Sequence, residues 1–484
     1  MCLVAAGGKE CMVNMFRNLF EKWIQWKLIL LIQIIISIVF AIFLIQLNVL
    51  PMIFIAIIIA IEILIGVGIF FLMRNAQKVR LIVSHIISLV VSIVLVMGCF
   101  VVNKGQSTLK NVTSDNLQTN RISLYVLDES SYQELNDLKN QNIEANVNDE
   151  HMAEAIDALN KEVDLSIQGQ EDYVQMSNDL YNQKTAGIYM NEAQSALFDE
   201  IHEDFHEKTR VLYTYEITEK VEDFSKDVSV TQNAFNVFIS GIDTTGPVST
   251  VSRSDVNMIV TVNPQSKKIL MTSIPRDYYV TLANMGQKDK LTHAGLAGVE
   301  NSVKTLENFL EIDINYYARV NFTSLIQMVD ALGGIEVYSD QDIPKLGIHE
   351  GINDMDGKKA LSFSRERYSY KNGDNHRVQN QQKVLEAMIN KMMSPAIITN
   401  YSSILENIDG SFETNMTSDE ITSLIRMQLN DMASWDIQQI QLQGRGAMLT
   451  GGAYMPGNRL YYMIPDEESV NQCVSKIKEI QGNN

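Results

Sequence analysis

Three long apolar runs near the N-terminus constrain the fold of this chain more than any other feature. Each is about twenty residues long, which is the length a helix needs to cross the hydrocarbon core of a membrane. The runs are Leu28–Leu50, Met52–Met73 and Leu81–Val102. No small-residue cleavage site closes the first run, so a removable signal peptide is not expected. The sequence therefore predicts a membrane anchor of three helices over residues 28–104.

Basic residues around these runs predict the orientation of the anchor. Arg74, Lys78 and Arg80 lie between the second and third runs, whereas the connection between the first and second runs has no basic residue. Because cytoplasmic loops carry an excess of Lys and Arg, residues 1–27 and the second connection are expected in the cytoplasm. Everything after Lys104 is then expected outside the cell membrane.

Charge distinguishes the anchor from the rest of the chain. The 484 residues carry a formal net charge of −19, although residues 1–104 are themselves basic. The remaining part is thus strongly acidic, whereas a protein that binds nucleic acid needs a basic surface to neutralise phosphates. Nucleic acid is therefore excluded as an expected partner, while local arginine clusters still suit one small anionic group.

Two parts follow the anchor, and they differ in composition. Residues 105–230 are poor in Gly and Pro and rich in Asn, Gln, Asp and Glu, with helical patterns at Met152–Val163 and Asn191–Arg210. Short strand-like pieces alternate with these helices, which predicts a small α/β accessory domain. Residues 231–484 predict a larger α/β domain, because their strands alternate with helices of about ten or more residues. We expect a mixed, largely parallel sheet with helices on both faces.

Charged residues mark the ends of three predicted strands in the larger domain. The strands are Phe235–Ile242, Val256–Val262 and Lys268–Ile274. The charged residues at their ends are Asp243, Arg253, Asp255, Arg276 and Asp277. Strands lying side by side bring such residues to one edge, where carboxylate oxygens suit Mg²⁺ and guanidinium groups suit phosphate oxygens. The pattern predicts a site for a metal and a phosphorylated ligand. The alternative is a set of surface ion pairs.

Further donors of the same kind stand later in the larger domain. They are Arg365, Arg367, Arg377 and Gln381. Arg377 and Gln381 are separated by four positions and so share one face of a predicted helix. Together with the two earlier arginines, these donors exceed what one divalent cation and two acids need, which favours a ligand with two phosphates. The alternative is a basic helix face that pairs with Glu366 and Asp374.

A rival reaction class is suggested by the run His202-Glu-Asp-Phe-His206. In zinc metalloproteases this HExxH spacing puts two histidines one helical turn apart, with the glutamate as general base. Here the surrounding residues 199–208 are charged nearly all round, which is typical of a solvated surface helix rather than a helix beneath a cleft. A zinc metalloprotease therefore stays a rival hypothesis, to be tested by the zinc content of the purified protein.

Several motifs in one fixed order resemble those of the LytR-CpsA-Psr family over Ala234–Met393. They are Ile242-Asp243, Val251–Asp255, Ile274–Asp277, Lys290–His293, Asn315–Asn321, Asp330–Ile335, Arg365–Tyr368 and Arg377–Gln382. The three apolar runs and the accessory domain are similar to the capsule-assembly (CpsA-like) subgroup of this family. One departure is Gln379, where related proteins often have a further arginine, so one positive contact of the family pattern is missing here.

This resemblance implies a phosphotransferase on the outer face of a bacterial membrane, with an α/β/α sandwich fold. It would move the glycan phosphate of a capsular polysaccharide or teichoic-acid-like polymer from a polyprenyl-pyrophosphate carrier to peptidoglycan in the cell wall. By the same resemblance Asp243 and Asp255 hold Mg²⁺, and Lys290 assists at the rim. The implied pyrophosphate contacts are Arg253, Arg276, Arg365, Arg367, Arg377 and Gln381.

The chemistry of phosphoryl transfer favours a positively charged site and a base near the acceptor hydroxyl. Asp374 is our hypothesis for the base because it precedes the arginine-bearing helix, so the expected catalytic residues are Arg253, Arg276 and Asp374. The alternative function is a membrane-anchored regulator or scaffold that binds lipid-linked polymer without turning it over. The stretch Gly444–Gly457 is expected to be a surface loop.

Overall fold

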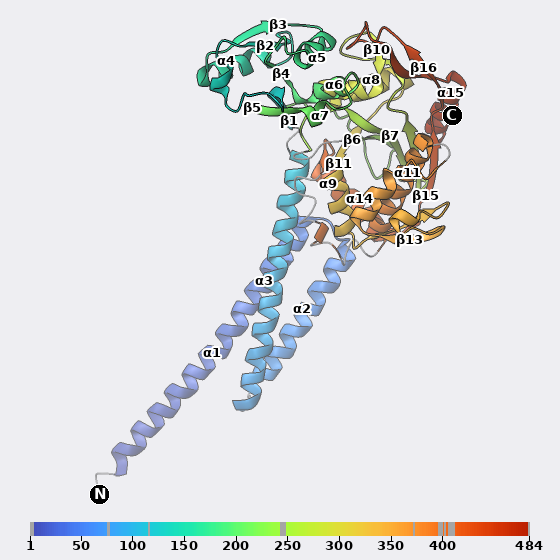
Figure 1. Cartoon of the computed structure of the whole chain (residues 1–484). Coiled ribbons are helices and arrows are strands. Elements are labelled where there is room, and N and C mark those ends of the chain that lie inside the picture. Colours follow the sequence, from blue (N-terminus) through green and yellow to red (C-terminus); the bar gives the residue numbers. More distant parts are fainter. Residues whose placement is uncertain are drawn as a thin grey trace. The chain divides into compact units, whose positions relative to one another are not determined.

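The computed structural model consists of two compact units, which are described separately (Figure 1). One unit comprises residues 1–110 and 421–432, and the other comprises residues 111–420 and 433–484. The residues that the structure describes are 4–74, 78–114, 117–242, 248–370, 373–394, 400, 403–404 and 412–482.

Three helices near the N-terminus are long and apolar enough to span a membrane, which confirms the three predicted apolar helices. The helices are α1 (Val4–Leu47), α2 (Met52–Met73) and α3 (Lys78–Ser114), and their apolar segments are Trp26–Leu47, Met52–Met73 and Val79–Thr108. The buried hydroxyl of Ser88 in α3 donates a hydrogen bond to Oε1 of buried Gln33 in α1, at 2.6 Å. Such a paired polar contact helps to hold apolar helices together in lipid.

The N-terminal part of the second unit is a five-stranded mixed sheet with a helix on each face. The strand order is β3-β2-β4-β1-β5, with β1 (Leu117–Leu127), β2 (Asn142–Ala145), β3 (Ser166–Gly169), β4 (Gly187–Asn191) and β5 (Thr209–Lys220). Leu124 of β1 packs in a cluster with α4 (Met152–Glu162), and Tyr125 packs in another with α5 (Tyr173–Tyr181). The residues of a strand alternate between faces, so this alternation explains how one strand supports both helices.

The predicted helix over Asn191–Arg210 is wrong. This segment instead forms three short turns of helix, η2 (Glu192–Gln194), α6 (Ser195–Asp199) and α7 (Phe205–Lys208). Phe198 and Phe205 are both fully buried and their rings lie 5.1 Å apart. The segment therefore folds inward around its aromatic side chains, and it is not the solvated surface helix that its charges suggested.

The larger sheet of the second unit has six strands in the order β14-β11-β6-β7-β8-β15. They are β6 (Phe235–Ile242), β7 (Ser254–Asn263), β8 (Lys268–Ile274), β11 (Tyr316–Asn321), β14 (Glu413–Thr414) and β15 (Asp436–Gln441). The sheet is mixed, as expected, but it is not largely parallel. β11 is parallel to β6 and β15 to β8, whereas β7 is antiparallel to both of its neighbours. The turn at 264–267 is too short for a parallel crossover, which needs about a dozen residues.

Helices cover both faces of this sheet, so the predicted α/β/α sandwich is confirmed. On one face Ile259 and Leu270 belong to a core cluster with residues of α8 (Gly298–Leu310) and α15 (Glu467–Gln481). On the other face Met258 and Met271 form a cluster with Leu385 and Ile389 of α11. Helix α11 spans Gly373–Met392.

Smaller helices and strands make up the rest of the described chain. They are β9 (Tyr279–Thr281), β10 (Lys288–Lys290), η3 (Leu291–Ala297), α9 (Phe322–Ala331), β12 (Ile335–Ser339), η4 (Pro344–Leu346), β13 (Gly351–Met355), α10 (Gly357–Ser364), α14 (Ser418–Asp431), β16 (Gly444–Leu449) and β17 (Leu460–Pro465), with η1 (Leu135–Leu138) in the N-terminal part. The expectation that Gly444–Gly457 is a loop is wrong for its first half, because β16 pairs with β17 along six residue pairs.

One apolar cluster joins the N-terminal part of this unit to the sandwich. Tyr125, Met176 and Phe198 from the five-stranded part share it with side chains of the larger part. The latter are Val251, Leu296, Met455, Leu460 and Tyr462. The two parts are therefore packed together through buried apolar surface.

Candidate active site at the end of the central sheet

The pairing register brings the ends of four strands side by side. We call the row of strand ends that they form the edge of the central sheet. Ile242 at the end of β6 pairs with Ser254 at the start of β7, and Asn257 pairs with Ile274 at the end of β8. Asn321 at the end of β11 lies beside Ile242. The predicted gathering of these strand ends is thus confirmed, and the residues that follow or begin them define the candidate active site.

Asp255 lies between two arginines at this edge. Nη1 of Arg276 donates a hydrogen bond to Oδ1 of Asp255 at 2.8 Å, and Nε of Arg253 lies 3.4 Å from Oδ2. The side chain of Asp255 is 15% exposed, and the hydroxyl of Thr292 in η3 also reaches its Oδ1, at 3.5 Å. Both carboxylate oxygens are therefore held in place at this edge of the sheet.

Gly295 of η3 is required for this arrangement because the helix passes very close to the start of β7. A Cβ atom at Gly295 would lie 2.6 Å from the carbonyl oxygen of Ser252 and 2.9 Å from the amide nitrogen of Ser254. Only glycine permits so close an approach to backbone atoms. The glycine lets Thr292 stand beside Asp255.

Arg365 lies at the same edge of the sheet, on the side of β11. Its guanidinium stacks over the ring of Phe322, at 4.4 Å from the ring centroid, and Phe322 directly follows β11. Arg367 is exposed, and its Nη2 donates to the hydroxyl of Tyr368 at 2.7 Å.

Helix α11 approaches the same edge through its first turns. Asn380 donates a hydrogen bond to the carbonyl oxygen of Phe363 in α10 at 3.2 Å, which ties the two helices together. Arg377 precedes Asn380 by one helical turn and Gln381 follows it, and both side chains are half-buried. The arginine-bearing end of α11 is thus next to the C-terminal end of α10, where Arg365 lies.

Two predicted site residues fall outside this description. Asp243 follows β6 directly but is not among the described residues, and the side chain of Asp374 at the start of α11 is likewise not described. Their assigned roles stay predictions.

Lys290 is more deeply buried than a residue at the rim of a site would be. Its side chain is 9% exposed, and Nζ donates a hydrogen bond to Oε1 of Glu200 at 2.7 Å. Nζ also lies 3.9 Å from Oδ1 of Asp277. Glu200 comes from the N-terminal part of the unit, just after α6, and no pattern in the sequence predicts that it approaches the site.

His293 forms the centre of a buried charged trio that sequence reasoning also missed. Its Nδ1 lies 2.9 Å from Oδ1 of Asp289, and its Nε2 lies 3.4 Å from Oε1 of Glu200. Burial lowers the pKa of His293, but the hydrogen bonds and charges of the two carboxylates outweigh it and raise the pKa to about 9. Burial opposes ionisation of Glu200, yet His293 and Lys290 lower its pKa to about 2. The trio is therefore a cation held between two carboxylates at neutral pH.

This trio predicts a loss of stability at alkaline pH. The pKa of His293 is about 9 in the folded chain and about 6.5 in an unfolded one, so its contribution is fully present below the lower value and lost as the pH rises through the higher. We expect the midpoint of thermal unfolding to fall by several degrees between about pH 7 and pH 10. A His293→Asn variant should lose this pH dependence, whereas His349→Asn should keep it because the His349 side chain is 85% exposed. A flat wild-type profile would contradict the assignment.

The HExxH motif does not have the geometry of a zinc site. His202 lies in a turn before α7, where its ring stacks on that of Tyr181 with centroids 3.8 Å apart. His206 lies in α7, and its Nε2 is 3.5 Å from Oδ2 of Asp199. The two histidines do not share one helix, so the arrangement on which the metalloprotease hypothesis rests is not present in this segment.

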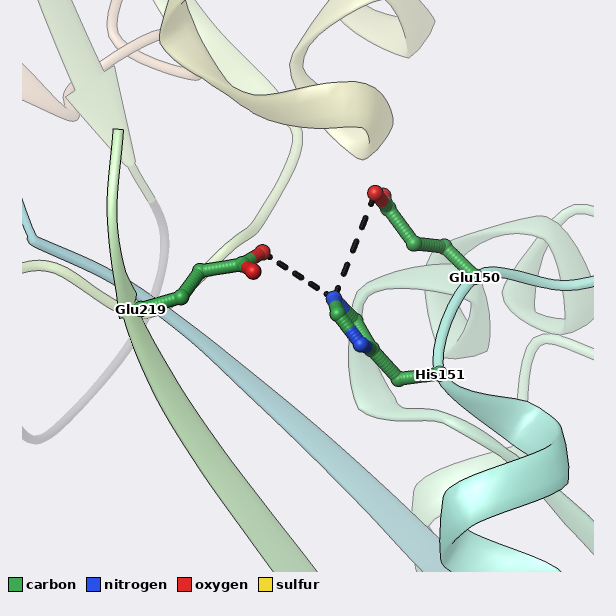
Figure 2. A group of neighbouring side chains, drawn as sticks. All are labelled: Glu150, His151 and Glu219. Atoms are coloured by element: carbon green, nitrogen blue, oxygen red, sulfur yellow. Dashed lines mark hydrogen bonds and ion pairs between the residues drawn. The ribbon is translucent and has the colours of Figure 1, made fainter. Parts of the chain in front are cut away.

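A separate cluster of a histidine and two glutamates lies in the N-terminal part (Figure 2). Nε2 of His151 lies 3.0 Å from Oε1 of Glu219 in β5 and 4.0 Å from Oε1 of Glu150. His151 precedes α4 directly. The hydrogen bond between His151 and Glu219 ties the start of α4 to β5.

The donors at the sheet edge fit Mg²⁺. This ion prefers hard oxygen ligands, and the partly exposed carboxylate of Asp255 supplies them. Asp243 directly follows Ile242, which pairs with the residue before Asp255.

Fold and site together define an anchored α/β/α protein with a carboxylate set between arginines at a sheet edge. The model of the LytR_cpsA_psr family matches residues 199–479, more than half of the chain, and the chain belongs to this family.

Curated relatives are similar to more than half of this chain. One from Enterococcus faecalis, named polyisoprenyl-teichoic acid–peptidoglycan teichoic acid transferase TagU, is 35% identical over 54% of this chain and 87% of its own length. One of the same name from Bacillus anthracis is 31% identical over 58% of this chain and 88% of its own. The crystal structure of B. subtilis TagV is 28% identical, with a TM-score of 0.45, and covers 52% of this chain and 99% of that chain.

Proposed function

We propose that this protein is a Mg²⁺-dependent phosphotransferase that moves a glycan phosphate from a polyprenyl-pyrophosphate carrier to peptidoglycan. The observation that carries the proposal is Asp255, held between Arg276 and Arg253 at the edge of the sheet. Membership of the family and the transferase names of its relatives support the same reaction. The polymer would be a teichoic acid or a capsular polysaccharide.

The reaction makes one bond to phosphorus and breaks another. The oxygen of the acceptor hydroxyl bonds to the phosphorus of the glycan phosphate, and the bond from that phosphorus to polyprenyl phosphate breaks. Such a transfer asks the protein mainly for positioning and for neutralisation of charge on the phosphate oxygens. Asp255 and Asp243 would hold Mg²⁺, which when bound neutralises part of that charge.

The arginines supply the rest of the positive charge. Arg253 and Arg276 stand on either side of Asp255, and Arg365 joins them from the side of β11. Arg367, Arg377 and Gln381 complete the proposed pyrophosphate contacts, because guanidinium groups bind phosphate oxygens through two parallel hydrogen bonds and the amide of Gln381 is a neutral donor. Lys290 contributes its charge from the buried side of the site.

The anchor would place this reaction on the outer surface of the cell membrane. The described helices include three apolar spans, and the basic residues Arg74 and Arg80 border the connection between the second and third. The excess of basic residues there favours a cytoplasmic connection, so the residues after the third span would be extracytoplasmic. Both the lipid carrier and peptidoglycan are accessible at that surface.

The Asp374→Asn variant tests the proposed base. In the proposed reaction the carboxylate of Asp374 takes up the proton of the acceptor hydroxyl, so the variant should bind lipid-linked glycan normally and transfer it about 100-fold more slowly. Binding is measured by co-sedimentation with vesicles that carry the glycan, and transfer by release of polyprenyl phosphate. An equal loss of both would contradict the role of Asp374 as a base.

The deciding experiment for the function uses the full chain in lipid nanodiscs with polyprenyl-pyrophosphate glycan, Mg²⁺ and peptidoglycan. Transfer releases polyprenyl phosphate and fixes the glycan to insoluble peptidoglycan. Binding of the lipid-linked glycan without release would instead favour a scaffold or regulator.

A further inference from the structure

The carboxylate of Glu200 enters the candidate active site from a different part of the unit. It follows α6 in a segment that packs into the five-stranded part through Leu197 and Phe198, both fully buried. The Glu200 side chain is itself only 17% exposed. Its Oε1 accepts a hydrogen bond from Nζ of Lys290 at 2.7 Å and lies 3.4 Å from Nε2 of His293.

From Glu200 a row of alternating charges leads to the proposed metal ligand. Nζ of Lys290 lies between Glu200 and Oδ1 of Asp277, 3.9 Å from the latter. Oδ2 of Asp277 lies 3.8 Å from Nε of Arg276, and Nη1 of Arg276 donates to Asp255 at 2.8 Å. Each charged group in this row has a neighbour of opposite charge, so the position of each side chain constrains the position of the next.

Lys290 transmits this constraint because it has little freedom to move. Its side chain is 9% exposed, and its Nζ lies 5.8 Å from the centroid of the Tyr462 ring. An ammonium group that is largely removed from water stays beside its carboxylate partners, since leaving them unpaired is costly. Glu200 is the partner at hydrogen-bonding distance and Asp277 is the more distant one.

We propose that Glu200 is a positioning residue of the transfer site: it fixes the Lys290 ammonium, which through Asp277 orients the Arg276 guanidinium for phosphate. This role rests on the function proposed above. It gives the N-terminal part of the unit a share in catalysis, because the carboxylate that completes the row belongs to that part.

The Glu200→Gln variant tests the role in the full chain in nanodiscs. Glutamine keeps the size of the side chain and removes its charge, so Lys290 loses its nearest anion. We expect kcat for release of polyprenyl phosphate to fall by about 10- to 100-fold, since small displacements of a positioning group have effects of this size. KM for the lipid-linked glycan should change much less. Glu203→Gln is the matched control, because Glu203 lies three positions further along the chain and is exposed.

A pH profile separates positioning from a general loss of structure. His293 is faced by Asp289 of β10, by Glu200 and by the ring of Tyr454, and Lys290 stands nearby on the same carboxylate. Without Glu200, Asp289 is the one carboxylate among the described residues that still pairs with the imidazolium, so His293 should lose its proton at a lower pH. The rate of Glu200→Gln should therefore decline between about pH 6 and pH 8, where wild-type His293 stays protonated and the wild-type rate stays level. Glu200→Asp keeps the charge and should restore the level profile.

The outcomes distinguish this inference from the proposed function. If the wild type releases polyprenyl phosphate and Glu200→Gln does so at the same rate and with the same pH profile, the positioning role is contradicted and the proposed function is not. A loss in Glu200→Gln that is equal at every pH and is not restored by Glu200→Asp would show a merely structural contact. A wild-type chain that releases no polyprenyl phosphate would contradict the proposed function and the positioning role with it.

Discussion

The Arg276→Ala variant is expected to release polyprenyl phosphate at least about 100-fold more slowly than the wild type. Arg276 pairs with Asp255 at 2.8 Å and stands at the end of β8, where the register also brings the ends of β6 and β11. In the proposed reaction its guanidinium steadies the negative charge that grows on the departing phosphate. Release is followed by chromatography of the lipid product.

The control for this variant is Arg445→Ala. Arg445 lies in β16 and is exposed, so its removal changes the net charge by the same amount without touching the sheet edge. If Arg276→Ala released polyprenyl phosphate as fast as Arg445→Ala does, Arg276 would take no part in transfer. Thermal unfolding of both variants shows whether a slow rate reflects loss of the fold.

The Asp255→Asn variant is the second change with a large expected effect. The amide keeps the shape of the carboxylate but removes the charge that pairs with Arg276 and Arg253 and that would hold Mg²⁺. We expect transfer to fall by about 100-fold or more, and the Mg²⁺ concentration that half-stabilises the chain in a thermal-shift titration to rise at least tenfold. In the wild type, EDTA should stop transfer and added Mg²⁺ should restore it.

Asp436→Asn is the matched control because Asp436 begins β15 at the opposite edge of the same sheet. Asp436 pairs with Lys268 at the start of β8, whereas the candidate site lies beyond Ile274 at its end. Unchanged Mg²⁺ affinity in Asp255→Asn would exclude Asp255 as a ligand, even if transfer were slow. The thermal-shift titration thus tests the metal site independently of activity.

The strands of the catalytic sheet were predictable because local sequence decides them. β6 and β8 have the predicted bounds, since each is a run of β-forming residues closed by turn residues. The gathering of Arg253, Asp255 and Arg276 followed from the three predicted strands together, although β7 begins at Ser254, two residues before its predicted start. The relative direction of neighbouring strands was predicted less well. The alternation of strands and helices later in the domain favoured parallel strands, whereas the short turn between β7 and β8 makes these two antiparallel.

The long-range contacts of the site were not predictable from sequence patterns. Glu200 stands in a charged stretch whose pattern predicts a solvated helix, because its charges outnumber its apolar residues. Its partner Lys290 is 90 positions away, and no local pattern connects the two. The hairpin of β16 and β17 was missed because the glycines of β16 weaken the alternation that marks a strand.

The apolar cluster that joins the five-stranded part to the sandwich bears on how this chain can be shortened. A truncated protein that began at residue 231 would carry Leu296, Met455 and Tyr462 without Tyr125, Met176 and Phe198, the side chains that now shield them. Exposing that surface costs about 25 cal/mol for each square ångström of apolar area, and exposed patches of this kind promote aggregation. Fragments made for crystallisation or inhibitor screening should therefore begin after the third membrane helix and not at the start of the sandwich.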